Sequence, residues 1–387
     1  MRLIQRAVAP ALLTAARHFP ALILTGARQS GKTTLLRALF PQASYHLLED
    51  PDLVGRVRAD PRAFMDELRL PAILDEVQNI PELLNYVRSR IDQSPSRKGR
   101  WLLTGSQEAP LMRGVSESMA GRAALFQLFP MSLEESPKVS MLRGGYPEVL
   151  AHPATASVWF RSYVQTYLER DVRSVTAVKD LSTFRRFLSI LASRCGQMLN
   201  KTDVAAPLGV SVPTIAEWLH VLEITCQLIL VPPYYENFGK RLVKSPKLYF
   251  ADSGLACHLL GIEHERMLRA SPFLGAIFEG FVASEIVKCS VNAGRRKELY
   301  YFRDQQGLEV DLVVPGTGNR LLFMEAKATR TVRPDMASSM QALARKGSRH
   351  AIERYVVHDA PARNEAATHA LAPGVMAVSP AELGRLV

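Results

Sequence analysis

The sequence predicts an α/β protein: a parallel sheet with a phosphate-binding loop, then a mostly helical region, then a second α/β domain. Three observations lead to this fold class. Apolar runs alternate with helical patterns over the first third of the chain, as in parallel sheets flanked by helices. A glycine-rich stretch lies between the first apolar run and the helix that follows it. Towards the C-terminal end, two neighbouring apolar runs carry carboxylates and a lysine at strand spacing.

The composition is that of an ordinary globular protein, with 47% hydrophobic and 22% charged residues. The 387 residues suffice for two or three domains of about 100–200 residues each. The net charge of +11 favours a polyanionic partner such as nucleic acid, with a merely soluble basic protein as the alternative. We therefore expect DNA as a partner.

The cysteines and the apolar runs exclude several classes of protein. The four cysteines lie about thirty residues apart and form no C-x-x-C pair, which excludes a zinc framework and a disulfide-rich scaffold. No apolar run reaches the roughly 18–20 residues that span a bilayer. The first residues lack the pattern of a signal peptide. We expect a cytoplasmic protein with reduced thiols and no membrane partner.

The first predicted elements are a helix over 2–19, a buried strand over 21–24 and a helix over 34–40. Between strand and helix, the chain fits G-x-x-x-x-G-K-[ST]. Such a loop points its N–H groups at phosphate oxygens, and the helix N-terminus adds its positive dipole end. We therefore predict ATP and Mg²⁺ as ligands, with Lys32 on the β/γ-phosphates and the Thr33 hydroxyl on Mg²⁺. The predicted nucleotide-binding residues are Gly26, Ala27, Arg28, Gln29, Ser30, Gly31, Lys32, Thr33 and Thr34.

Two further strands are predicted to end at the same edge of the sheet. The run 71–74 ends in Asp75 and Glu76, where an open α/β sheet places its ligand chemistry. We predict Asp75 beside Mg²⁺ and Glu76 as the base that activates water, with a solvated acidic turn as the alternative. The run 100–103 is followed by three polar residues that could contact the γ-phosphate or the attacking water: Thr104, Ser106 and Gln107.

Five stretches in this first part resemble a prokaryotic AAA+-like ATPase family. In that family, the ATPase core carries a C-terminal domain of uncharacterised function with a restriction-endonuclease-like fold, and the resemblance covers nearly the whole chain. The stretches that carry it are 26–36, 73–78, 101–107, 118–122 and 128–135.

The resemblance implies roles for individual residues. It implies a Walker A lysine at Lys32, a Walker B pair at Asp75 and Glu76, and a sensor-type position near Ser106. Arg122 matches the basic position of the family's S-x-A-G-R stretch. Two alternatives stay open for Arg122: a catalytic arginine acting in trans in a homo-oligomer, or a surface arginine that packs on its own domain. Arg113 is a weaker candidate for the role in trans.

The turn at 144–148 marks the expected end of the nucleotide-binding part. We predict an ATPase domain over 1–140, a helical and winged-helix region over 141–250, and a restriction-endonuclease-like domain over 251–387. Apolar spacing predicts helices over 157–173 and 184–192. A helix–turn–helix over 200–223 would be followed by wing strands at 228–231 and 247–250.

The expected recognition helix is poor in basic residues, but the wing is rich in them. Such a cluster suits contacts to phosphates, which position a protein without reading sequence. The alternative is a winged helix that packs against protein. The predicted DNA contacts are Lys240, Arg241, Lys244 and Lys247.

The C-terminal part carries a PD-(D/E)-x-K-like pattern. A helix over 273–287 precedes strands over 298–303, 308–314 and 321–328. Asp311 lies on the second strand, and Glu325 and Lys327 lie on one face of the third, which would suit Mg²⁺ binding and activation of water. Glu279 is the preferred third carboxylate and Glu285 the second choice. A domain that only binds, without cleaving, is the alternative.

Three functions follow from these patterns. The first is a Mg²⁺-dependent ATPase that acts on DNA through the winged-helix and nuclease-like parts. The second is an ATP-gated, Mg²⁺-dependent DNA nuclease. The third is a nucleotide-dependent signalling or toxin–antitoxin-like switch that binds a protein partner.

Overall fold

A computed structural model describes residues 4–105, 119–168, 181–234, 245–344, 349–360 and 368–387. The described residues up to Pro130, with Ile224–Cys226 and Val291–Arg295, form one unit. The remaining described residues form a second unit. The division of the chain at residues 140 and 250 stays a prediction.

The first unit is built on a five-stranded sheet in the order β2-β3-β4-β1-β5, and every pair in it is parallel. The predicted α/β class with a parallel sheet is confirmed. Because all five strands run the same way, their carboxyl ends lie at one edge. The strands are β1 (Ala21–Gly26), β2 (Ser44–Leu47), β3 (Ala72–Asp75), β4 (Trp101–Thr104) and β5 (Ala123–Leu128).

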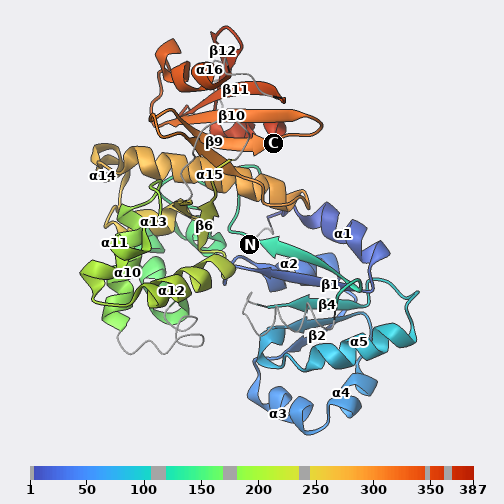
Figure 1. The fold of residues 1–387 in the computed structure, drawn as a ribbon. Helices are drawn as coiled ribbons and strands as arrows, with labels where there is room; N and C mark the ends of the chain where they lie inside the picture. Colours follow the sequence, from blue (N-terminus) through green and yellow to red (C-terminus); the bar gives the residue numbers. More distant parts are fainter. Residues whose placement is uncertain (1–3, 106–118, 169–180, 235–244, 345–348, 361–367) are drawn as a thin grey trace. The chain divides into compact units, whose positions relative to one another are not determined.

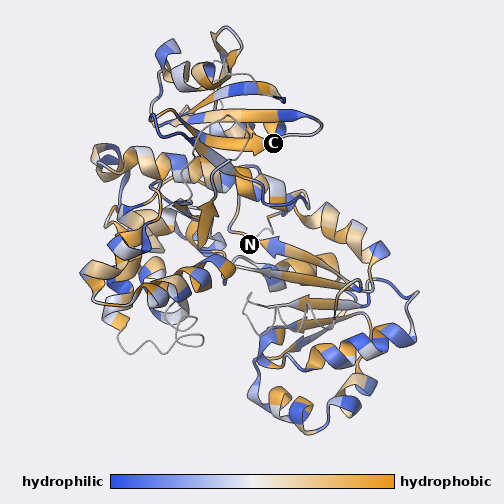
Figure 2. Cartoon of the chain, in the orientation of Figure 1, coloured by the Kyte–Doolittle hydropathy of each residue, from blue (hydrophilic) through white to orange (hydrophobic). Residues whose placement is uncertain are grey.

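Helices cover both faces of this sheet (Figure 1). Alternate residues of β1 serve the two faces: Leu22 and Leu24 pack with α1 and α2, whereas Ile23 packs with α3, α4 and α5. The central strands β1 and β4 are accordingly buried along their whole length and are mostly hydrophobic (Figure 2). The helices are α1 (Ala9–His18), α2 (Lys32–Leu39), α3 (Pro51–Ala59), α4 (Pro61–Glu67), the 3₁₀ turn η1 (Val77–Asn79) and α5 (Leu83–Gln93).

The first helix is shorter than the sequence pattern predicts. Helix α1 begins at Ala9, and residues 4–8 are not helical. Pro10 lies in its first turn, where the missing N–H costs no hydrogen bond and the fixed φ favours a helix start. The helix predicted over 2–19 was therefore wrong for residues 4–8, the described residues that precede α1.

The second unit begins with helices and a two-stranded sheet. The expected helix–turn–helix residues form α11, η4 and α12, with Gly209 at φ +67° between them, and β6 pairs antiparallel with β7. That this arrangement is a winged helix stays a prediction. The elements are α7 (Pro147–Ala151), η2 (Pro153–Thr155), α8 (Ala156–Tyr163), the π-helix η3 (Val164–Leu168), α10 (Leu181–Ser193), α11 (Lys201–Ala205), η4 (Ala206–Leu208), α12 (Val212–Ile224), β6 (Leu228–Val231), β7 (Lys247–Phe250), α13 (Ser253–Leu259) and α14 (Glu265–Ala270).

Within the described residues, no single helix is long and apolar enough to cross a membrane, although the bent pair 201–208 and 212–224 passes on length and composition together.

The rest of the second unit is α15 (Leu274–Asn292) and a six-stranded mixed sheet in the order β12-β13-β11-β10-β9-β8. Strands β8, β9 and β10 form antiparallel neighbours, and β10, β11 and β13 are parallel. The elements are β8 (Tyr300–Arg303), β9 (Glu309–Pro315), β10 (Arg320–Lys327), η5 (Pro334–Ala337), α16 (Ser338–Ala344), β11 (Ala351–His358), β12 (His369–Ala372), β13 (Val375–Val378), η7 (Pro380–Glu382) and α17 (Leu383–Leu386).

A glycine turn interlocks with the start of α13. The buried Asp252 carboxylate accepts the N–H groups of Gly145 at 2.7 Å and Leu255 at 3.0 Å. Gly144, at φ +66°, passes so close that a Cβ there would lie 2.0 Å from Asp252 Oδ1. Because the clash would involve a buried carboxylate that already accepts two hydrogen bonds, only glycine fits this position.

Substituting Gly144 tests this close approach, and Gly209 provides a matched control. Both glycines have nearly the same positive φ, but nothing lies within 4 Å of a Cβ at Gly209. We expect Gly209→Ala to cost about 1–2 kcal/mol, the strain of a left-handed alanine. Gly144→Ala should cost about 3 kcal/mol more, because it also displaces a buried hydrogen-bonded carboxylate.

Chemical denaturation, or the change in Tm if unfolding is irreversible, measures the difference between the two variants. Equal destabilisation by both substitutions would contradict the interlock.

Candidate functional site

The phosphate-binding loop connects β1 to α2 and holds its own lysine. Lys32 is buried, and its Nζ donates to the carbonyl oxygens of Gly26 at 3.1 Å and Ala27 at 3.0 Å. Burial lowers the pKa of Lys32, and the nearby Glu76 carboxylate opposes that shift. The ammonium therefore lies inside the loop, next to the N–H groups that face a phosphate.

The two glycines of the G-x-x-x-x-G-K-[ST] pattern are required for different structural reasons. Gly26 has φ +136°, and a Cβ there would lie 2.1 Å from the Leu128 carbonyl oxygen on β5. Gly31 has φ +95°, but the nearest atom to its Cβ position is Arg6 Nη1 at 3.9 Å. Gly26 is therefore required by the neighbouring strand, whereas Gly31 is required by its backbone conformation alone.

Asp75 is the centre of the hydrogen bonding at this edge of the sheet. Its Oδ2 accepts the hydroxyls of Thr33 and Tyr45, each at 2.8 Å, and its Oδ1 accepts the hydroxyl of Thr104. The carboxylate is 2% exposed, and the three donors come from α2, β2 and β4. Burial and the bond to Asp75 raise the pKa of the Tyr45 phenol, so it stays a donor.

The Thr33 hydroxyl and the Asp75 carboxylate are the predicted Mg²⁺ ligands. They lie side by side, and both present the oxygen donors that Mg²⁺ prefers. The residues present therefore fit this ion, with further oxygens supplied by a nucleotide.

Glu76 directly follows this carboxylate and has an unusual backbone. Its φ of 58° is left-handed, which is rare for a residue other than glycine and is concentrated at functional sites. Its N–H donates to Thr104 Oγ1 at 3.4 Å, and its carboxylate accepts the side-chain amide of Gln78. The side chains of Glu76 and Asp75 are thus adjacent in the sequence but have different hydrogen-bond partners.

Two residues of this site were missed by the sequence reasoning. Arg6 is buried and donates to the carbonyl oxygens of Ser30 at 2.7 Å and Phe129 at 2.8 Å. It thereby braces the loop from a partner 24 residues away, and no local pattern marks it. Tyr45 could have been found from the pairing of β2 with β3, which brings Leu47 opposite Asp75.

Of the remaining nucleotide-site predictions, Ser106, Gln107 and Arg113 lie outside the described residues. Arg122 donates to Asp92 through Nε at 2.6 Å and Nη2 at 3.0 Å. That bond to Arg122 lowers the pKa of Asp92. Arg122 thus forms an ion pair within its own domain, and a role in trans stays a prediction.

In the second unit, the structure brings the predicted Asp311, Glu325 and Lys327 together on paired strands. Lys327 Nζ donates to Glu325 Oε2 at 2.6 Å and lies 3.5 Å from Asp311 Oδ2. Asp311 Oδ2 also accepts the Ala326 N–H at 3.0 Å. Burial, then repulsion from Asp311, raises the pKa of Glu325 to about 8. These three residues form one charged cluster.

Glu279, on α15, belongs to the same cluster. Burial, then repulsion from Asp311, raises the pKa of Glu279 to about 7. Its Oε1 accepts the Tyr249 hydroxyl at 2.5 Å and the Lys247 ammonium at 2.9 Å. Glu285, the second choice from sequence, instead pairs with Lys288 at 2.9 Å and accepts the Leu133 N–H.

Lys247 is not placed as the sequence predicted. Its side chain is 4% exposed and binds both Glu279 and Glu309, so it does not belong to a basic surface. The prediction of Lys247 as a phosphate contact was wrong, because its spacing beside other cations hid its burial in β7. The other predicted DNA contacts, Lys240, Arg241 and Lys244, lie outside the described residues.

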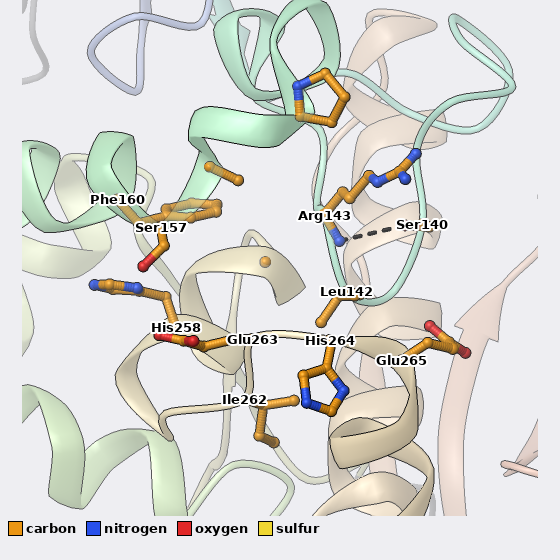
Figure 3. A pocket seen from close by; sticks show the side chains of 13 residues that line it. Ser140, Leu142, Arg143, Ser157, Phe160, His258, Ile262, Glu263, His264 and Glu265 are labelled. Carbon is orange, nitrogen blue, oxygen red and sulfur yellow. Dashed lines mark hydrogen bonds between the residues drawn. The ribbon is translucent and has the colours of Figure 1, made fainter.

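A separate cavity of about 540 Å³ opens in the second unit beside α8 and α13 (Figure 3). His258 stacks on Phe160 with ring centroids 5.7 Å apart, and burial lowers the pKa of the imidazole. Arg143 and Glu263 give the lining both signs of charge. No residue of this cavity was singled out from the sequence.

Among the described residues, no group of three or more His, Cys, Asp or Glu side chains is arranged to hold a metal ion. All four cysteines are buried and free of disulfides. Burial raises the pKa of Cys195 and Cys257 to about 12, so both thiols stay protonated.

Three family models match consecutive parts of the chain. Residues 18–136 match an AAA domain. Residues 135–266 and 274–373 match two domains of unknown function, DUF8612 and DUF4143.

Two curated relatives match most of the chain. These are the uncharacterized protein Mb2031c of Mycobacterium bovis and the uncharacterized protein Rv2008c of Mycobacterium tuberculosis. Each is 34% identical over 347 residues, which cover 88% of this chain and 77% of the relative.

Among solved structures, the chain is similar to a Walker-type ATPase of Pyrococcus abyssi. The TM-score is 0.44 at 16% identity, over 66% of this chain and 96% of that one.

Proposed function

Because this chain belongs to the same family as the two mycobacterial proteins and is a P-loop ATPase, we propose that its hydrolysis of ATP depends on Mg²⁺ and drives work on DNA. The observation that carries the Mg²⁺ dependence is the hydrogen bond of 2.8 Å between the Thr33 hydroxyl and the buried Asp75 carboxylate.

The chain's own groups support a simple sequence of events. Lys32 exchanges its bonds to the Gly26 and Ala27 carbonyls for bonds to phosphate oxygens when ATP binds. Thr33 and Asp75 would hold Mg²⁺, which would neutralise charge on the phosphates. The hydroxyls of Tyr45 and Thr104 keep the Asp75 carboxylate oriented.

Glu76 supplies the base. Its carboxylate accepts the proton of the water that attacks the γ-phosphorus. The two adjacent carboxylates have different side-chain partners, Gln78 for Glu76 and three hydroxyl groups for Asp75, which supports assigning them two roles. The side-chain amide of Gln78 donates a hydrogen bond to the Glu76 carboxylate.

DNA is the proposed partner because the chain has a net charge of +11 and carries an acid–lysine cluster of the kind that processes phosphodiesters. Cleavage of DNA is the second candidate, and the observation in its favour is the approach of Lys327 to Glu325 and Asp311.

A partner-binding switch is the third candidate, and a different observation favours it. The exposed side chains of α12 include Glu217 and His220, and its described residues contain no lysine or arginine. A helix of this composition repels phosphates more than it attracts them. It suits a protein surface.

The first prediction concerns turnover. Lys32→Ala should abolish ATP binding or hydrolysis, because it removes the cation that contacts the phosphates. Glu76→Gln should still bind ATP but hydrolyse it about 10²–10⁴-fold more slowly, the usual contribution of a general base. Phosphate release and nucleotide binding are measured for both variants, with Arg122→Gln as a control that tests the alternative of catalysis in trans. Parental turnover in Lys32→Ala would refute the proposed site.

The second prediction concerns DNA. Linear, single-stranded and branched DNA should each be compared for stimulation of ATPase activity and for binding over a salt series. A protein that neutralises six to ten phosphates loses about 10³–10⁵ in affinity between 50 and 200 mM salt. Absence of binding at 50 mM with every DNA would favour the partner-binding switch.

The third prediction separates cleavage from binding. If the acid–lysine cluster cleaves DNA, the parental protein with Mg²⁺ or Mn²⁺ and ATP should cut at least one of these DNAs. Lys327→Ala should abolish the cutting without changing ATPase activity. No cutting of any substrate would remove the nuclease candidate and leave the ATPase proposal intact.

A further inference from the structure

The acid cluster of the second unit contains a cation that the PD-(D/E)-x-K-like pattern does not include. Lys247, the first residue of β7, inserts its ammonium between Glu279 Oε1 at 2.9 Å and Glu309 Oε1 at 2.7 Å. Its side chain is 4% exposed, against 33% for Lys327. Of the two lysines, Lys247 is thus the one withdrawn from solvent.

The carboxylates that a metal would need are already occupied. Glu279 Oε1 accepts both the Lys247 ammonium and the Tyr249 hydroxyl. Asp311 Oδ2 accepts a hydrogen bond from the Ala326 N–H. Glu325 Oε2 accepts a hydrogen bond from the Lys327 ammonium. This agrees with the absence, among the described residues, of a group of three or more His, Cys, Asp or Glu side chains arranged to hold a metal ion.

Charge balance leads to the same point. Lys247 Nζ lies between the carboxylates of Glu279 and Glu309, which supply the negative charge that a buried ammonium requires. Glu309 has a second cation, Arg303, at 3.4 Å. A divalent ion beside the buried ammonium would be repelled by it, and displacement of Lys247 would leave its stem to be repacked.

We propose that the Lys247 ammonium takes the place of a divalent cation at Glu279, so that the cluster binds no divalent metal while Lys247 is inserted. The proposal concerns the same acid–lysine cluster as the nuclease candidate. It takes the choice of site from that candidate, but it does not require that the cluster cleaves DNA. It assigns a metal-excluding role to a residue of β7, on an element other than the strands that carry Asp311, Glu325 and Lys327.

Mn²⁺ binding, followed by the electron paramagnetic resonance signal of the free ion, tests the proposal without any cleavage assay. The full-length protein is used without nucleotide and with Asp75→Asn, which removes the carboxylate of the ATP site. We expect no Mn²⁺ to bind at the cluster of this background protein. Lys247→Met, made in the same background, should bind one additional Mn²⁺ per chain.

Two matched variants locate the gained site. Lys247→Arg keeps the cation and should gain no Mn²⁺. Lys247→Met combined with Glu279→Gln should lose the gained ion. A folded Lys247→Met protein, judged by circular dichroism, that binds no additional Mn²⁺ would overturn the proposal.

If Lys247→Met does not fold, the background protein still decides the matter. Mn²⁺ binding in that protein, abolished by Glu279→Gln or Asp311→Asn, would overturn the proposal. If the background protein binds no Mn²⁺ that depends on Glu279 or Asp311, the proposal is supported. DNA cleavage is scored separately, so failure of the nuclease candidate and failure of this inference are distinguishable.

Discussion

The nucleotide site depends on one buried carboxylate and the three hydroxyls that it accepts. Asp75 joins α2, β2 and β4 through Thr33, Tyr45 and Thr104, so the carboxyl ends of two strands and the start of the loop helix are fixed together. A buried carboxylate without such donors would carry a large desolvation cost. The three donors hold the Asp75 oxygens in place as possible metal ligands. They thereby also fix the end of β3, directly before Glu76.

The second unit uses the same device twice, with different outcomes. Asp252 is buried and bonded to backbone N–H groups, which fix a glycine turn against α13. Glu279 is partly buried, with 16% of its side chain exposed, and is bonded to a phenol and an ammonium. In the first case the carboxylate organises backbone, and in the second it binds a side-chain cation. Burial makes both arrangements specific, because a misplaced partner would leave a charge without solvent.

The parts of this protein that could be predicted from sequence are those fixed by local spacing. The loop from Gly26 to Thr33 and the pair at Asp75 have the strand and helix context that was expected. Contacts over long distances in the chain were predicted only where a motif marked both partners, as for Thr33 and Asp75. Arg6 reaches Phe129 across 123 residues, and Lys247 looked like a surface cation because neighbouring cations flank it in the sequence. A local pattern reports which residues alternate along a strand but not which neighbouring element covers them.

The tight packing of Gly26 against Leu128 affects how mutational scans of this protein are interpreted. In a library screened for ATPase activity, every substitution at Gly26 would score as a loss of function, alongside those at Lys32. The cause would differ, because a side chain at Gly26 pushes apart two strands and lowers the yield of folded protein. An abundance measurement on the same library would separate the two positions, and conservation alone would assign both to nucleotide binding.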